Sequence, residues 1–270
     1  MKYALCLQPY IPMRSEASER SEMVSQLLFG DTFRITDEVP HWFFVERDCD
    51  GYTGWIDWKT AVILSEVDYL RYVNGATSAP LLRLPYNQAQ KKVHGQTAMA
   101  WLPWGARIYN IDDSGITFHM EGVRFDVSPT AYVPPVSATS MSRTACAKFL
   151  VQQAQLLLNV PYLWGGCSAF GLDCSGFAQT LFRFIGIALP RNASQQAECG
   201  TKVAFEDRLI GDLAFFGEGG KVSHVGLVGD NDQIIHVSGA LHIDELRKEG
   251  IFSAAQERIT HKLISVRRLF

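Results

Sequence analysis

The sequence predicts an α+β fold in which a β-rich first half is followed by helices and then by antiparallel strands. Short β-rich runs separated by turn residues fill residues 1 to about 135. Helical apolar spacing begins at Ser142, and the spacing becomes that of strands after Gly211. A chain of 270 residues has room for two or three small domains.

Composition narrows the function classes. Apolar residues make up 47% and charged residues 20% of the chain, as in an ordinary globular protein. A net charge of −3 without a long basic run argues against nucleic-acid binding. No segment has the length of a membrane span, and the apolar run after Met1 is too short for a signal peptide. We therefore expect a cytoplasmic protein that neither binds nucleic acid nor enters a membrane.

The six cysteines contain no CxxC pair. In a chain of this size without an export signal, they are expected to be free thiols rather than disulfides. Cys167 and Cys174 are seven residues apart, and no second pair completes a zinc site. The sequence thus predicts no structural metal and no cofactor.

The first half is expected to hold two small barrels, at residues 1–65 and 66–135. Residues 32–36, 42–46 and 51–56 have β-rich composition, and an Asp-Gly turn signal precedes the last run. Residues 66–135 again look β-rich, for example at 108–111 and 116–118, and segment 103–108 echoes segment 30–35. Prolines and small polar residues then predict a linker at 136–144, before a domain at 145–270.

The second half centres on a glycine-rich loop that leads to Asp173 and Cys174. An apolar stripe with helical spacing follows, so Asp173 is expected to cap a helix that begins at Cys174. Free N–H groups and the helix dipole at this end favour a thiolate, which makes Cys174 a candidate nucleophile. Taken alone, an inert buried cysteine is the commoner case.

Two downstream histidines change that balance. His224 and His236 lie in predicted strands 222–228 and 233–237, joined by a short turn, and strands so joined pair as a hairpin. A thiol nucleophile needs a base, and the base needs a partner that orients its second ring nitrogen. The other histidines have no such context and are expected to be structural or surface residues: His41, His94, His119, His242 and His261.

A family resemblance follows from the order of the motifs. They are Leu-Asp-Cys-Ser-Gly-Phe at 172–177, Pro-Arg-Asn-Ala-Ser-Gln-Gln at 190–196, Gly-Asp-Leu at 211–213, Ser-His-Val-Gly at 223–226 and Ile-His at 235–236. Residues 145–270 thereby resemble the NlpC-type, papain-like cell-wall cysteine peptidases. The resemblance implies that Cys174 is the nucleophile, His224 the general base and His236 the polar residue that orients it.

The front half resembles bacterial SH3 domains, through Arg14, Gly30-Asp31, Trp42 to Val45 and the Gly-Tyr-Thr-Gly-Trp-Ile run at 51–56. Joined to such a peptidase, these domains make the chain similar to γ-D-glutamyl-L-diamino acid endopeptidases, also called dipeptidyl-peptidase VI. Those enzymes take murein stem peptides with a free N-terminal L-alanine and release L-Ala-γ-D-Glu. A cytoplasmic member would recycle imported murein peptides.

The resemblance also implies substrate contacts. The free amine is held by a tyrosine and an acid of the first SH3 domain, matched by Tyr52 and by Glu16, with Glu19 or Glu22 equally suited. The remaining implied contacts are Trp164, Asp173, Ser175, Arg191, Asn192 and Ser223.

One departure stands out. The subfamily often has Asp-Ser after Pro-Arg, whereas this chain has Asn192-Ala193. A neutral amide gives no charge-assisted bond to an ammonium group, so another acid binds the amine or selectivity for it is weaker. Arg191 suits an anionic substrate group, and equally a helix-capping or surface role.

Several alternatives remain open at this stage. An acyltransferase or amidase on the same frame differs only in the acceptor, and a general wall hydrolase would act outside the cell. A wall-binding protein with an inactive site is the alternative that is not an enzyme. A transglutaminase-like fold would use Asp230 or Asp232 in place of His236.

Overall fold

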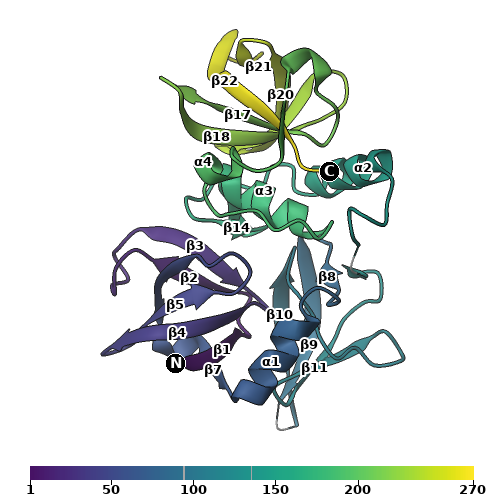
Figure 1. Ribbon diagram of the computed structural model, residues 1–270. Coiled ribbons are helices and arrows are strands. Elements are labelled where there is room, and N and C mark those ends of the chain that lie inside the picture. Colours follow the sequence, from purple (N-terminus) through teal and green to yellow (C-terminus); the bar gives the residue numbers. More distant parts are fainter. Residues whose placement is uncertain (94, 135) are drawn as a thin grey trace. The chain divides into compact units, whose positions relative to one another are not determined.

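The computed structural model describes residues 1–93, 95–134 and 136–270. The prediction for His94 and the predicted domain end at 135 therefore lie outside the described residues. The chain divides into two compact units, residues 1–135 and 136–270 (Figure 1). The predicted order, a β-rich region followed by an α+β domain, is confirmed.

A seven-stranded antiparallel sheet builds the first part of unit 1, in the order β3-β2-β6-β5-β4-β1-β7. The three predicted strands are confirmed as β4, β5 and β6, and the core between the strands is apolar, with Phe33 and Val45 fully buried. The elements are β1 (Lys2–Cys6), β2 (Tyr10–Arg14), β3 (Met23–Leu28), β4 (Thr32–Val39), β5 (Trp42–Arg47), β6 (Thr53–Asp57), η1 (Trp58–Thr60) and β7 (Ala61–Leu64).

The second part of unit 1 is β-rich, as predicted, and it also contains a helix that was not expected. It opens with a helix, α1 (Glu66–Gly75), because the Ser65 hydroxyl caps it by accepting the Asp68 N–H. Residues 108–111 were expected to form a strand and form none. The remaining elements are β8 (Leu81–Leu82), β9 (Tyr86–Val93), β10 (Gln96–Pro103), β11 (Thr117–Met120), β12 (Val123–Asp126) and β13 (Tyr132–Val133).

Both parts of unit 1 contribute to one apolar core. Phe29 of the first part packs edge-on against Phe118 and Phe125 of the second. Arg107 Nη1 lies 3.3 Å from the Asp31 carboxylate, and the Arg107 N–H donates to the Phe29 carbonyl. The division at residue 65 stays a prediction, since the two parts share their packing.

Unit 2 begins with the predicted linker, whose Ala138 N–H donates to the Ile185 carbonyl. The first helix starts as predicted, because the Ser142 hydroxyl accepts the Ala145 N–H. The helices and short elements are α2 (Arg143–Gln155), β14 (Cys167–Ser168), β15 (Gly171–Leu172), α3 (Cys174–Arg183), α4 (Ala193–Gln196), β16 (Thr201–Val203) and η2 (Phe205–Asp207).

Six antiparallel strands of unit 2 close into a barrel, because β21 pairs with β22 as well as with β20. Four of these strands were predicted and are confirmed as β17, β18, β19 and part of β22, from predicted ranges 212–216, 222–228, 233–237 and 263–266. Strands β20 and β21 were not expected. Strand β16 extends the sheet beside β22. The barrel strands are β17 (Leu213–Glu218), β18 (Lys221–Val228), β19 (Gln233–Ser238), β20 (Ala240–Arg247), β21 (Gly250–Ser253) and β22 (Arg258–Arg268).

Helix α3 packs against strands β18 and β19 (Figure 1). Every residue from Cys174 to Phe182 is buried, so the helix is enclosed on all sides. This packing brings the first residue of α3 to the strand that carries His224.

Candidate active site

The loop before α3 is fixed by one carboxylate. Asp173 caps the helix as predicted: its Oδ1 accepts the Gly176 N–H at 2.7 Å, and its Oδ2 accepts the Gly165 N–H at 2.9 Å. Gly176 has no side chain because a Cβ there would lie 2.1 Å from the Gly166 carbonyl oxygen. The position of Cys174 is thus set by the cap and by close backbone packing.

Arg191 completes this support from the segment before α4. Its guanidinium is 2% exposed, forms a two-pronged ion pair with Asp173, and donates to Ser175 Oγ at 2.8 Å. Three side chains with implied substrate contacts therefore contact one another and are buried. Their direct contact with substrate stays a prediction, whereas their support of the Cys174 loop is part of the fold.

The Cys174 thiol is buried against β18 near Val225. Burial, reinforced by the charge of Asp173, raises its pKa to about 11, while the backbone N–H groups of Val225 and Ser175 act in the opposite direction. The expectation that the helix start alone favours a thiolate is thereby corrected, because desolvation outweighs the favourable dipoles. A neighbouring base must take the proton when the thiol attacks.

His224 and His236 form the linked pair that the hairpin predicts. Their strands pair antiparallel, and His224 Nε2 lies 2.9 Å from His236 Nδ1. Burial lowers the pKa of His224 well below its usual range and that of His236 to about 3, so both rings are neutral at rest. Because Nε2 of His224 is engaged with His236, Nδ1 is the ring nitrogen that remains to accept a proton from a thiol.

A glycine makes room for this pair. Gly226 lies on the same face of β18 as His224 and directly opposite His236. A Cβ at Gly226 would come within 3.0 Å of the His236 Cβ and 2.8 Å of Ile234 Cγ1. The missing side chain lets the His236 ring lie beside His224.

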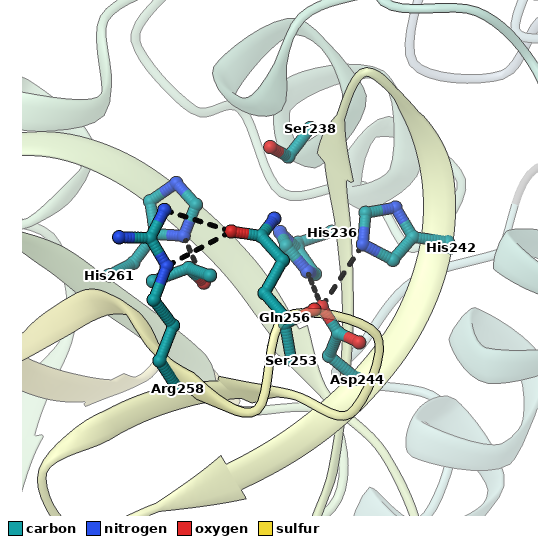
Figure 2. A pocket seen from close by; sticks show the side chains of 9 residues that line it. His236, Ser238, His242, Asp244, Ser253, Gln256, Arg258 and His261 are labelled. Carbon is teal, nitrogen blue, oxygen red and sulfur yellow. Dashed lines mark hydrogen bonds and ion pairs between the residues drawn. The ribbon is translucent and has the colours of Figure 1, made fainter.

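The hydrogen-bonded chain continues into β20 (Figure 2). His236 Nε2 lies 3.3 Å from Asp244 Oδ2, and His242 Nε2 lies 3.1 Å from the same oxygen. A carboxylate only accepts hydrogen bonds, so it places a proton on His236 Nε2. His236 Nδ1 then accepts from His224 Nε2–H, which leaves the lone pair of His224 on Nδ1. With Cys174, this arrangement offers the residue types that covalent catalysis requires, and the roles of nucleophile, base and orienting partner stay predictions.

The remaining predicted contacts are divided between the units. Trp164, Asn192 and Ser223 are exposed in unit 2, and Trp164 is 60% exposed. Tyr52 is half-buried and Glu16 exposed in unit 1. Asp230 and Asp232, the partners expected for a transglutaminase-like site, lie at the hairpin turn, and Asp232 pairs with Arg208.

Sequence reasoning missed four residues around this centre. His242 and Asp244 come from β20, the strand it did not expect, and His261 stacks on His224 with ring centroids 4.3 Å apart. The expectation that His242 and His261 lack a site context is therefore wrong. Tyr162 lies near enough to Cys174 for the two charges to interact, and burial raises the pKa of its hydroxyl to about 12. Its position in the loop at 161–166, shortly before Cys174 in the sequence, could have indicated that Tyr162 lies near the site.

Comparison with known proteins supports the same division. A model of the bacterial dipeptidyl-peptidase SH3 domain matches residues 13–59, and a model of the NlpC/P60 family matches residues 159–260. The γ-D-glutamyl-L-lysine dipeptidyl-peptidase of Bacillus subtilis (strain 168) is 32% identical over 226 residues, which cover 78% of this chain and 71% of that protein. The chain belongs to the NlpC/P60 family. It is thus a cysteine peptidase with an SH3-like β region in front, as the motifs predict.

Other relatives agree with this assignment. The probable endopeptidase NlpC of Escherichia coli (strain K12) is 41% identical over 108 residues, covering 39% of this chain and 70% of that protein. A crystal structure of an NlpC/P60 family protein from Bacillus cereus ATCC 10987 has a TM-score of 0.80 at 18% identity, covering 98% of this chain and 99% of that one, and shows the shared fold. No helix within the described ranges is both long and apolar enough to cross a membrane.

Proposed function

We propose that the chain hydrolyses the γ-D-glutamyl–diamino acid bond of murein stem peptides with a free N-terminal L-alanine, and that it releases L-Ala-γ-D-Glu. The observation that carries the chemistry is the 2.9 Å contact between His224 and His236 on the strand pair that faces Cys174. The substrate class rests on similarity to the γ-D-glutamyl-L-lysine dipeptidyl-peptidase of Bacillus subtilis. An enzyme with this preference acts on peptide fragments, as peptidoglycan recycling requires.

The acylation step uses the neutral resting pair. His224 Nδ1 takes the Cys174 proton as sulfur attacks the γ-glutamyl carbonyl carbon. The charge that develops on His224 is stabilised through its Nε2–H bond to His236, whose own proton is held by Asp244. Backbone N–H groups at the start of α3 are the donors that this proposal assigns to the oxyanion.

The remaining steps return the enzyme to its resting state. The tetrahedral intermediate collapses, the C–N bond breaks, and His224 gives its proton to the leaving amine of the diamino acid. Water, deprotonated by His224, then attacks the thioester. The dipeptide leaves as a carboxylic acid, and the Cys174 thiol is restored.

Amine recognition is the part of the proposal carried by the resemblance alone. Tyr52 and one of Glu16, Glu19 and Glu22 belong to unit 1, and exposed Asn192 supplies no charge in unit 2. We infer that an SH3-domain acid carries the charge-assisted contact that Asn192 does not make.

Product analysis by mass spectrometry tests this function. L-Ala-γ-D-Glu-L-Lys should give L-Ala-γ-D-Glu and lysine, its N-acetylated form should be cleaved far more slowly, and the Cys174→Ala variant should cleave neither. Equal cleavage of both peptides would refute the free-amine requirement. If neither peptide is cleaved while iodoacetamide still labels Cys174, the substrate assignment fails and a transferase with another acceptor becomes the better explanation.

A further inference from the structure

Three side chains of the barrel point their ligand atoms at one position behind the histidine pair (Figure 2). His236 Nε2, His242 Nε2 and a carboxylate oxygen of Asp244 all lie within 4.8 Å of one another. They come from neighbouring strands, since His236 on β19 pairs directly with His242 on β20. The peptidase mechanism uses only two of these three side chains.

The backbone orients the third side chain as a metal ligand. His242 Nδ1 donates to the Ala240 carbonyl at 2.8 Å, so the proton of the neutral ring lies on Nδ1 and the lone pair lies on Nε2. That lone pair faces the carboxylate oxygen of Asp244 at 3.1 Å. Two acceptors at this distance repel unless a proton or a metal ion lies between them. Metal-binding histidines usually donate their other N–H to a carbonyl in this way.

The spacing and the surroundings suit a small transition-metal ion. Tetrahedral zinc with ligand bonds of about 2.0–2.2 Å separates its ligand atoms by about 3.3 Å. The Asp244 oxygen lies 3.3 and 3.1 Å from the two ring nitrogens. A polar cavity of about 300 Å³ opens beside the three atoms, so a water has room as fourth ligand. Imidazole with carboxylate favours zinc over magnesium or calcium.

We propose that His236, His242 and Asp244 bind a zinc-class divalent cation, and that this ion switches Cys174 off by reversing the tautomer of His224. The switch rests on the proposed role of His224 as base, whereas the binding does not. Metal on His236 Nε2 moves the ring proton to Nδ1, which must then donate to His224 Nε2. The His224 proton consequently moves to Nδ1, and the lone pair that would accept the thiol proton is lost. The two rings share two protons before and after, so the exchange balances.

Calorimetric titration with zinc chloride tests the site in the Cys174→Ala variant, where the thiol cannot bind the metal. We expect one ion per chain. Adding His242→Asn should weaken binding by at least about 10- to 100-fold, since loss of a partner behind a ligand already costs that much. His119→Asn, which removes an exposed imidazole of unit 1, should bind like its parent. Unchanged thermal midpoints confirm folding. Equal zinc affinity with and without His242 would overturn the proposal. So would the absence of zinc binding in the Cys174→Ala variant.

Alkylation of Cys174 by iodoacetamide, followed peptide by peptide, tests the switch without a substrate. Saturating zinc should slow alkylation at least about tenfold in the wild type and less than about twofold in His242→Asn at the same concentration. Bound zinc that leaves the alkylation rate unchanged refutes the switch. If the murein peptides are not cleaved and zinc still slows alkylation through His242, the metal site stands and only the substrate assignment fails.

Discussion

Replacing Asp244 by asparagine should harm catalysis more than replacing it by alanine. The Asp244 oxygen contacts His236 Nε2 at 3.3 Å and His242 Nε2 at 3.1 Å, and the His242 proton is held on the other nitrogen by Ala240. An asparagine amide N–H at this position donates to both rings. The His236 proton then sits on Nδ1, and His224 receives the tautomer that cannot accept the thiol proton.

The magnitudes follow from the bonds involved. Alanine removes one long bond to a charged group, worth about 1.5 kcal/mol, and lowers kcat/KM about tenfold. Asparagine adds the cost of breaking an amide bond, about 1 kcal/mol, to reach the active tautomer, so kcat/KM should fall about 100-fold.

Lysine release from L-Ala-γ-D-Glu-L-Lys, measured in EDTA over a range of substrate concentrations, gives kcat and KM for each variant. Because Asp244 acts through His236, the loss should appear in kcat rather than in KM. Asp244→Glu serves as the control that retains an acceptor. An asparagine variant as active as the alanine variant, or more active, would refute the tautomer argument.

Three further outcomes are expected. Gly226→Ala should lower kcat about tenfold with little change in KM, because the added Cβ pushes the His236 ring by a few tenths of an ångström; wild-type kinetics would contradict this. Arg191→Ala should lower the free energy of unfolding by about 3–5 kcal/mol in urea titrations, since it leaves a buried carboxylate unpaired; a raised KM at unchanged stability would instead favour a substrate contact. The pKa of Cys174 is raised and that of His224 lowered, so the neutral pair persists from below about pH 6.5 to about pH 10, and kcat at saturating peptide should form a plateau over this range. A steep rise through about pH 8 in the pH–rate profile would count against a neutral resting pair.

The helix start at Cys174 and the pairing of the two histidines were predictable because their signals are local. Asp173 caps α3 through contacts three residues away, and a short turn pairs the strands of His224 and His236. Strand β20 gave no such signal, because Asp244 and Glu245 interrupt its β-rich pattern with residues of low β propensity. Only pairing with β19 and β21 fixes this strand, and that pairing places His242 and Asp244 beside His236.

Helix α1 was missed for a different reason. Its Ser65 cap and its spaced tyrosines were readable, but the aromatic content of the segment pointed to strands. The raised pKa of the Cys174 thiol was also out of reach, since desolvation depends on what packs around α3 rather than on the sequence near it.

The register between β18 and β19 has a consequence for how this enzyme tolerates change. Gly226 faces His236, and side chains alternate between the two faces of a strand. A slip of β19 by one residue would turn the imidazole of His236 from the face that carries His224 to the opposite one, with no intermediate position. Insertions and deletions in the hairpin are therefore tolerated only when they are confined to the turn and leave the strand register unchanged. Related enzymes can vary the turn in sequence and size, but the register of the paired strands must be kept.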